Sequence, residues 1–190
     1  MNGRCGKLCA VAVVTSSSSP YEAILGEAFA SLHPHVRRAH LAPLRAEGTI
    51  DVEHGPGWLT RPIIWLMKLP AAGPRQPVRL DVAADGSELV WTRRIGESVL
   101  RTRQYATGAS GSRLVERSGI GRVSFDLAVD DGALLYRQSS FHVAGVPVPS
   151  SLSPRVGAVV SATADGWHVV VTVEWRGRIV CRYAGAIRAS

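Results

Sequence analysis

The sequence predicts a mainly β fold: a single antiparallel β-barrel or strongly curved, lipocalin-like sheet of about ten strands, with an N-terminal helix and a short lid-like helix. From Pro77 onward the chain divides into nine short β-forming runs, most of them ending in DG, IG, TG, SG or AG turn signals. Residues 46–54 alternate with a period of two and add a tenth strand. Because a flat sheet of this width would leave exposed edges, we expect it to close or curve strongly.

The length of 190 residues fits one domain. We assign residues 20–190 to the barrel and residues 1–19 to a leader or a first strand. Arg4 and Lys7 precede a short apolar run, Leu8–Val14, which resembles a weak secretory signal. No window approaches the roughly 20 apolar residues of a membrane span. The odd count of three cysteines fits a reducing compartment, so we expect a cytoplasmic protein.

Two helices are expected before the nine runs. Residues 20–32 have the three-and-four apolar spacing of an amphipathic helix, with Ser19 as N-cap and Pro20 in the first turn. Residues 57–69 are apolar nearly all round, with Pro62 in or near the first turn. Because this short helix is so apolar, we expect it to plug an opening or to lie over one as a lid.

The nine runs follow in order. They span residues 78–86, 88–96, 98–108, 112–119, 122–132, 133–145, 154–166, 167–177 and 178–187. Several have one cleanly apolar alternate set, which we expect to face the interior: Val78, Leu80, Val82; Val123, Phe125, Leu127, Val129; Trp167, Val169, Val171, Val173, Trp175; and Ile179, Cys181, Tyr183, Ile187.

A middle group of strands has mixed faces. Trp91 and Ile95 share a face with Arg93; Val99 shares with Arg101, Arg103 and Tyr105; Leu135 and Phe141 share with Arg137. On the first strand, Glu47, Thr49, Asp51 and Glu53 share one face. Buried carboxylates are costly unless compensated. We therefore expect a partly charged lumen in which Asp51 and Glu53 pair with some of these arginines. The alternative is that all these charges face solvent.

The candidate site residues follow from this lumen. As catalytic residues we predict Asp51, Glu53, His54, Glu116, Tyr136 and His142, with Tyr105 and Asp126 as further proton-handling candidates. As substrate-binding residues we predict Trp58, Trp65, Trp91, Arg93, Arg103, Tyr105, Arg137 and Phe141. The alternatives are structural roles for the two histidines and core packing for the two tyrosines.

No cofactor, metal or nucleic acid is expected. The sequence has no GxSxG, GxxxxGK or HExxH motif and no GxGxxG after a strand. Cys5 and Cys9 are too few for a zinc site. The net charge is +7, but 20 of the 22 basic residues are arginines, spread along the chain with no run longer than two. Nucleic-acid binders concentrate such residues on one element.

Four motifs carry a resemblance: LGEAFASLHPHVRRAH (25–40), EGTIDVEHGPGWL (47–59), LVERSGIGRVSFDLAVDDGALLYR (114–137) and GVPVPSSLSPRV (145–156). They resemble a bacterial, β-rich domain family of unknown function, found alone or fused to saccharopine-dehydrogenase-like or short-chain reductase modules. The resemblance covers about residues 21–187 and implies no catalytic residues. Residues 1–19 depart from it, as do Phe141 and His142, where the family is usually basic.

Three functions are compatible with the sequence. The first is a cofactor-independent cyclase or isomerase that folds an extended apolar, polyketide-like intermediate in a shaped cavity, with acid or base assistance. The alternative is a non-catalytic carrier or binding module for a lipid-like or aromatic ligand. The third is a structural or partner-binding domain with a filled barrel. A homodimer is compatible with each of them. Convergent ionisable groups with shifted pKa values would favour the enzyme.

Overall fold

The computed structural model describes residues 19–58, 60–108 and 112–190. Its helical elements are α1 (Pro20–Leu25), the 3-10 helix η1 (Gly26–Ser31), α2 (Pro34–Ala39) and α3 (Thr60–Met67). Its strands are β1 (Leu44–His54), β2 (Gly73–Asp85), β3 (Glu88–Ile95), β4 (Ser98–Thr107), β5 (Arg113–Ser118), β6 (Gly121–Asp130), β7 (Ala133–Val143), β8 (Val146–Pro147), β9 (Arg155–Ala162), β10 (Trp167–Trp175) and β11 (Arg178–Ala189).

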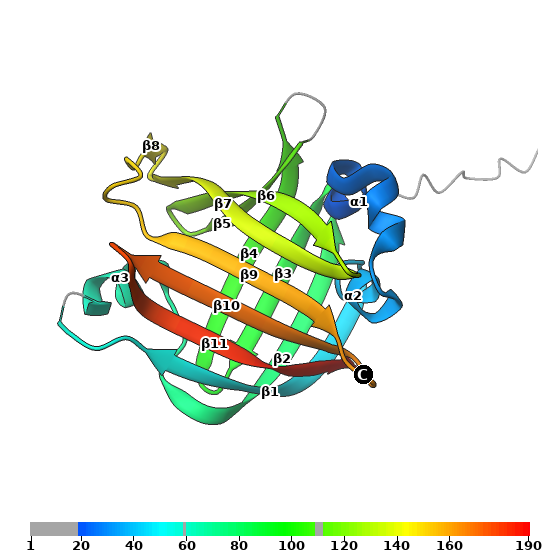
Figure 1. The fold of residues 1–190 in the computed structure, drawn as a ribbon, viewed down its shortest axis with the longest axis horizontal. Helices are drawn as coiled ribbons and strands as arrows, with labels where there is room; N and C mark the ends of the chain where they lie inside the picture. Colours follow the sequence, from blue (N-terminus) through cyan, green and yellow to red (C-terminus); the bar gives the residue numbers. More distant parts are fainter. Residues whose placement is uncertain (1–18, 59, 109–111) are drawn as a thin grey trace, which may run out of the picture.

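The strands form a closed antiparallel barrel (Figure 1). Ten of them follow one another around it in chain order, and β1 pairs with β11 to close the ring. The two-residue β8 pairs only with the end of β7, so that β9 can follow β7 directly. The predicted fold class is therefore confirmed. Each of the ten predicted strands corresponds to an observed one, and β8 is the addition.

The barrel has two different ends because successive antiparallel strands place their connections alternately at one end and the other. We call one the closed end: α1, η1 and α2 lie over it (right in Figure 1), and the His33 backbone N–H donates to the Gly132 carbonyl oxygen at 3.0 Å. We call the other the open end: it carries α3 (left in Figure 1) and the β3–β4, β5–β6, β7–β9 and β10–β11 connections.

The N-terminal helical segment begins as predicted and continues differently. Ser19 caps α1 in a capping box with Glu22, and Pro20 occupies the first turn. However, α1 ends at Leu25, where Gly26 takes a positive φ of 53°, and a 3-10 helix follows. Pro34 begins a separate helix, α2, because proline suits a first helical turn. The lid-like helix predicted over residues 57–69 is α3, Thr60–Met67.

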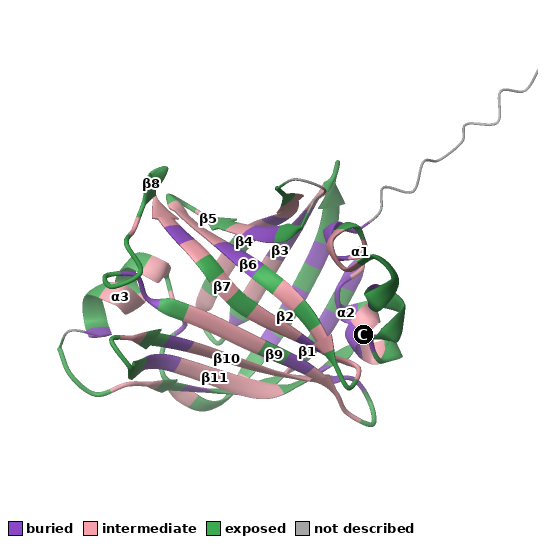
Figure 2. Cartoon of the chain, turned by 45° about the horizontal axis from the view of Figure 1, so that its top comes forward, coloured by how far each residue is buried: buried purple, intermediate pink, exposed green. Residues whose placement is uncertain are grey.

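The hydrophobic core lies between the inward faces of the strands and the closed-end helices, where Tyr21, Val36 and Leu134 are fully buried. Figure 2 shows the alternation of burial along the strands. None of the described helices is long and apolar enough to cross a membrane. The predicted leader, residues 1–19, lies outside the described residues except for Ser19.

Candidate functional site

A cavity of about 210 Å³ lies inside the barrel. At the closed end it reaches Ala39 and His40, and at the open end it reaches Leu66 of α3 and Ile120 of the β5–β6 turn. Leu66 and Ile120 line the cavity and are also exposed on the outside, Ile120 to 61%. The mouth of the cavity therefore lies between α3 and the β5–β6 turn. Most of the wall is apolar, with Leu80, Val123, Phe125, Phe141, Val169 and Val171 among its side chains.

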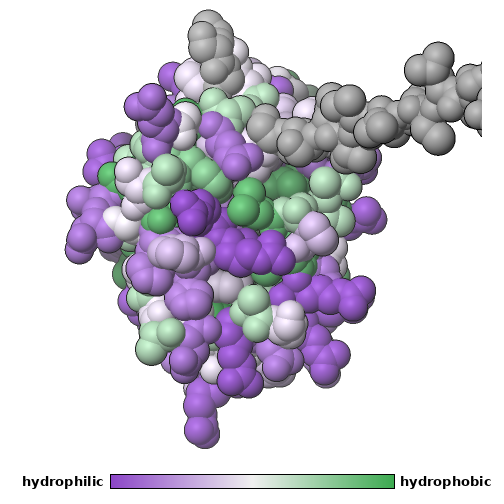
Figure 3. Space-filling model, turned by 90° about the vertical axis from the view of Figure 1, so that its right-hand side faces the viewer, coloured by the Kyte–Doolittle hydropathy of each residue, from purple (hydrophilic) through white to green (hydrophobic). Residues whose placement is uncertain are grey.

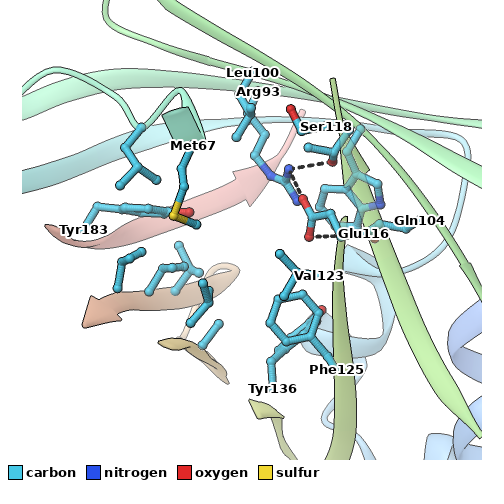
Figure 4. Close-up of a pocket in the computed structure, with 18 of the residues that line it drawn as sticks. Met67, Arg93, Leu100, Gln104, Glu116, Ser118, Val123, Phe125, Tyr136 and Tyr183 are labelled. Carbon is cyan, nitrogen blue, oxygen red and sulfur yellow. Dashed lines mark hydrogen bonds and ion pairs between the residues drawn. The ribbon is translucent and has the colours of Figure 1, made fainter. Parts of the chain in front are cut away.

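One ion pair interrupts this apolar wall. The Arg93 Nη1 atom donates to the Glu116 Oε1 atom at 2.9 Å and to the Thr102 hydroxyl at 2.9 Å. The two charged side chains keep 19% and 21% of their surface accessible. Because both line the cavity, the ion pair is presented to it instead of being sealed behind other side chains (Figure 4).

A chain of hydrogen bonds runs from this ion pair to the closed end. The Gln104 amide donates to Glu116 Oε2 at 2.9 Å, and its oxygen accepts from the Tyr21 hydroxyl at 2.6 Å. The Tyr136 hydroxyl lies 3.1 Å from the Tyr21 hydroxyl and 2.8 Å from His40 Nε2. This polar chain joins β3, β4, β5 and β7 to the N-terminal helices, so it links the cavity wall to the cover of the closed end.

When His40 is neutral, the polar chain lacks the proton that one of its hydrogen bonds would need. His40 Nδ1 lies 2.7 Å from the Val36 carbonyl oxygen, which only an N–H can satisfy, so we assign the proton to Nδ1. The Tyr136 hydroxyl then donates to Nε2. Because Tyr21 donates to Gln104, no proton remains between the two tyrosine oxygens. That contact is the longest in the polar chain.

The pKa values of the ionisable groups move away from neutrality. Burial opposes the charge on Glu116, but Arg93 and the Gln104 amide outweigh it and hold the carboxyl pKa below its usual value. Burial lowers the pKa of His40 to about 4, against the hydrogen bond to Val36. Burial raises the pKa of Tyr136 well above its usual value and that of Tyr183 to about 12. At neutral pH the cavity therefore holds one compensated ion pair among neutral groups.

Five of the predicted site residues line the cavity: Trp91, Arg93, Glu116, Tyr136 and Phe141. Their positions agree with the prediction of a lumen lined by charged and aromatic side chains. Their chemical roles stay predictions. Trp91 is buried and its indole N–H has no hydrogen-bond partner among the described residues.

The predicted interior position of Asp51 and Glu53 is wrong. Both side chains are exposed, and the opposite face of β1, with Ile50 and Val52, is buried. Asp51 accepts a hydrogen bond from the Arg75 backbone N–H at 2.7 Å. The acidic row needs no interior partner because arginines flank it on the outside. Across from Glu47 and Glu53 lie Arg79, Arg182 and Arg188.

The predicted faces of β4 are also reversed. Leu100, Thr102 and Gln104 line the cavity, so Arg103 and Tyr105 lie on the other face. Arg103 pairs on the surface with Asp85 at 2.7 Å and Glu88 at 2.9 Å. Arg101 is exposed on that same outer face. The face that turns inward is therefore the one with the neutral residues Thr102 and Gln104, and Arg101 and Arg103 lie on the outer face.

A β-bulge explains the errors on β7. The pairing with β6 shifts between Ser140 and Gln138, so two residues of β7 oppose one of β6 and the alternation changes phase at Ser139. Tyr136 before the bulge and Phe141 after it both line the cavity. Arg137 is exposed and His142 does not line the cavity. Strict alternation, which grouped Arg137 with Phe141, was therefore wrong on this strand.

The remaining predicted residues lie outside the cavity wall, Trp58, Trp65 and His54 near the open end and Asp126 toward the closed end. Trp58 and Trp65 are exposed to 76% and 81% and do not line the cavity, so their substrate-binding role stays a prediction. The lid helix instead turns Leu66 and Met67 toward the cavity. His54 is on the inward face of β1, but its Nε2 atom contacts the Pro70 carbonyl oxygen at 2.8 Å. Asp126 pairs with Arg113 on the surface.

Sequence reasoning missed four polar or aromatic residues of the site: Tyr21, His40, Thr102 and Gln104. Tyr183 was expected to face the interior but was not named as a site residue. Tyr21 and His40 lie on the N-terminal segment, which carries no β pattern and covers the barrel only in the folded chain. Thr102 and Gln104 were on the face taken as outer. Among the described residues no group of three or more His, Cys, Asp or Glu side chains is arranged to hold a metal ion.

Comparison with known proteins supports the resemblance stated above. A family model for a domain of unknown function, DUF4166, matches residues 32–187. The chain belongs to the DUF4166 family. No curated protein matches it in sequence.

Two solved structures are similar to this DUF4166 chain in fold. One is a secretory abundant heat soluble protein from Ramazzottius varieornatus, with 11% identity and a TM-score of 0.41 over 76% of this chain and 93% of that one. The other is described as the REP1-NXSQ fatty acid transporter, with 10% identity and a TM-score of 0.35 over the same shares. At these values neither match carries an argument about function.

Proposed function

We propose that this DUF4166 barrel is a binding or carrier module for a small, apolar, net-neutral molecule that offers one hydrogen-bond acceptor. The observation that carries the proposal is the cavity with a mostly apolar wall and a single, already compensated ion pair. Binding sites for small molecules commonly combine such a wall with a few polar groups that fix orientation.

The size of the cavity limits the ligand. Its volume of about 210 Å³ is below the roughly 300–1,000 Å³ usual for drug-sized ligands. A compact ring or short chain fits this volume better than the extended polyketide-like chain expected from the sequence. A longer molecule would have to project through the mouth between Leu66 and Ile120.

The charge of the cavity limits the ligand further. Arg93 is already paired with Glu116, so a second anion in the cavity would stay uncompensated at a cost of several kcal/mol. The hydrogen bonds of the Arg93 guanidinium within the described residues all involve Nη1. A neutral carbonyl or ether oxygen can therefore accept from the other guanidinium nitrogens without breaking the ion pair.

The proposal is tested with three ring compounds of similar size: cyclohexanone, methylcyclohexane and cyclohexanecarboxylate. Saturation-transfer NMR is expected to detect cyclohexanone binding, at least about ten-fold tighter than the hydrocarbon because of a charge-assisted hydrogen bond, and tighter than the carboxylate. Equal affinity for all three, or none for any, would contradict the proposal.

A matched pair of variants on β9 separates cavity binding from surface binding. Ala158→Phe places a ring in the cavity, because Ala158 lines it, whereas Val159→Phe places the same ring on the outer face. Cyclohexanone binding is expected to disappear in Ala158→Phe and to persist in Val159→Phe, with both variants folded by circular dichroism. Binding that survives in Ala158→Phe would place the ligand elsewhere.

A cyclase or isomerase is the second candidate, because Glu116, Tyr136 and His40 all border the cavity. We rank it below the carrier because general acid–base catalysis works best with a pKa near the working pH. The shifts of these groups all point away from neutrality. Protein-catalysed deuterium exchange at the α-carbon of cyclohexanone, lost in Glu116→Gln and kept in Asp51→Asn, would reverse the ranking.

A cytoplasmic location, bacterial origin and fusion to reductase modules stay predictions.

A further inference from the structure

The exposed large hydrophobic residues are concentrated at the open end. Nine such residues are exposed in the described part of the chain, and eight of them lie on the α3 segment or on, or within two residues of, the connections of this end: Trp58, Trp65, Leu66, Val99, Ile120, Val146, Leu152 and Ile179. We call these eight the apolar rim. Only Val159, on β9, lies elsewhere. Single exposed apolar residues need no explanation, but a cluster at one end of a barrel indicates an interaction surface.

The rim includes the elements that frame the cavity mouth. Leu66 and Ile120 belong both to the rim and to the cavity wall. On α3, Trp65 and Leu66 are exposed while Met67 borders the cavity (Figure 4). A partner on the rim would therefore contact the only helix that touches the mouth among the described residues.

The charges of the open end are mainly basic. Within two residues of its connections the chain has eight basic residues, Arg61, Lys68, Arg94, Arg117, Arg122, Arg155, Arg176 and Arg178, against three acidic residues, Glu53, Glu97 and Glu174, a formal charge of +5. None of these eleven side chains is in an ion pair within the described residues. The basic groups are thus free for an external anionic partner.

The closed end differs in both respects. By the same count, the described residues of this end have a formal charge of −2. They include five basic residues, Arg37, Arg38, Arg45, Arg113 and Arg188, and seven acidic residues, Glu22, Glu27, Asp85, Glu88, Asp130, Asp131 and Asp165. Figure 3, which looks onto this end, shows mostly hydrophilic side chains around scattered hydrophobic ones. The molecule is therefore polarised from one end to the other.

We propose that the apolar rim docks on an anionic lipid surface, with the cavity mouth turned toward the lipid. Trp58 and Trp65 suit the membrane interface because the indole ring is apolar and carries one polar N–H. Flanking arginines and lysines attract anionic headgroups while their stems lie along apolar surface. The combination of apolar side chains with an excess of +5 favours lipid over a flat protein partner. This docking goes beyond ligand binding and does not depend on an occupied cavity.

Vesicle flotation with the full chain tests the proposal. Vesicles of phosphatidylcholine and phosphatidylglycerol in equal amounts are expected to carry the protein at low salt, and vesicles of phosphatidylcholine alone to carry much less. Added salt is expected to weaken the binding, because it screens charges on a surface. Failure to float with anionic vesicles at low salt would overturn the proposal.

Two variants with matched controls locate the contact. Trp58→Ser with Trp65→Ser, and separately Arg155→Glu with Arg178→Glu, are each expected to reduce partitioning at least about ten-fold. Val159→Ser controls the first, and Arg37→Glu with Arg38→Glu at the closed end controls the second. Rim variants that partition like the unchanged chain would overturn the proposal. So would rim-dependent self-association without flotation, which would assign the surface to a second copy of this chain.

The cavity variant keeps the two proposals apart. Ala158→Phe leaves the exterior unchanged, so it is expected to float with anionic vesicles like the unchanged chain while losing cyclohexanone. A chain that binds the ketone but fails to float would overturn docking alone. A chain that floats but never binds the ketone would overturn only the ligand proposal.

Discussion

The closed half of the barrel carries the surface ion pairs found within the described residues, whereas at the open end large apolar side chains are exposed and the charges counted there form no ion pair among the described residues. Five of the six ion pairs within the described residues involve Arg45, Arg103, Arg113 or Arg188 on the surface of the closed half, and the sixth lies in the cavity. The polar chain from Glu116 to His40 runs beneath the helices of that same end. The closed end holds the helical segment on the barrel. In the functions proposed above, the open end is the one that faces ligand and lipid.

The largest expected effect comes from breaking the ion pair between Arg93 and Glu116, at which the polar chain begins. Glu116→Ala leaves the Arg93 guanidinium uncompensated and removes the partner of the Gln104 amide. We expect a loss of about 3 kcal/mol in the free energy of unfolding, at the lower end of the range for buried pairs because both side chains face the cavity. Urea denaturation measures it.

The double variant Arg93→Met with Glu116→Leu controls that prediction. Because it removes both charges together, most of the lost stability is expected to return. A double variant as unstable as Glu116→Ala would mean that Glu116 acts through shape or through Gln104, and not through compensation of the Arg93 charge.

Lowering the pH is expected to reduce the stability of the folded protein because His40, at the closed end, is buried in its neutral form. Its pKa is lowered from 6.5 to about 4 in the folded protein, so the unfolded chain takes up the proton first. The stability that neutral His40 provides is therefore fully present above pH 6.5 and is lost as the pH falls from about 6.5 toward about 4. The loss is roughly 3 kcal/mol at about 1.4 kcal/mol per pKa unit.

Urea midpoints measured between pH 7 and pH 4 test this effect. His40→Gln, which does not titrate, is expected to start from a lower stability and to change less over that range. The proton gained by His40 would complete the contact between Tyr21 and Tyr136, but the lowered pKa means that burial outweighs this gain. If the urea midpoint falls equally with pH in the unchanged chain and in His40→Gln, His40 is not the group that causes the loss of stability.

The smallest expected effect tests the link between helix and barrel. Tyr21→Phe removes a fully buried hydroxyl and leaves the Gln104 oxygen without its donor, at a cost of about 1–2 kcal/mol. Tyr105→Phe, on the outer face of β4, is the control and is expected to change stability by less than about 0.5 kcal/mol. Amide exchange over residues 20–39 is expected to accelerate in Tyr21→Phe only.

Several features were predictable because they depend on local chemistry. Turn residues such as Gly86, Gly132 and Gly177 take positive φ values, which glycine adopts without a steric penalty, and they mark the ends of strands. Ser19 with Glu22 likewise marks a helix start from its own hydrogen bonds. The presence of Trp91 and Arg93 in a lumen also followed from the mixed face of their strand, whereas Glu116 was predicted only as a proton-handling residue. The site was therefore predicted in part, through residues of strands whose inner face was chosen correctly.

The sequence alone determined the ten strands of the barrel, their order of appearance and most of the turns between them, because turn chemistry and a period of two act over a few residues. Only the tertiary structure decided which face of β4 turns inward, since both of its faces carry polar side chains. On β1 the inward set is apolar, and the acidic row on its outer face lies across from arginines of β2 and β11. The tertiary structure also decided the change of phase at Ser139, which alternation cannot reveal. The contacts of Tyr21 and His40 with Gln104 and Tyr136 join residues as many as 115 positions apart, and exist only once the helices cover the barrel.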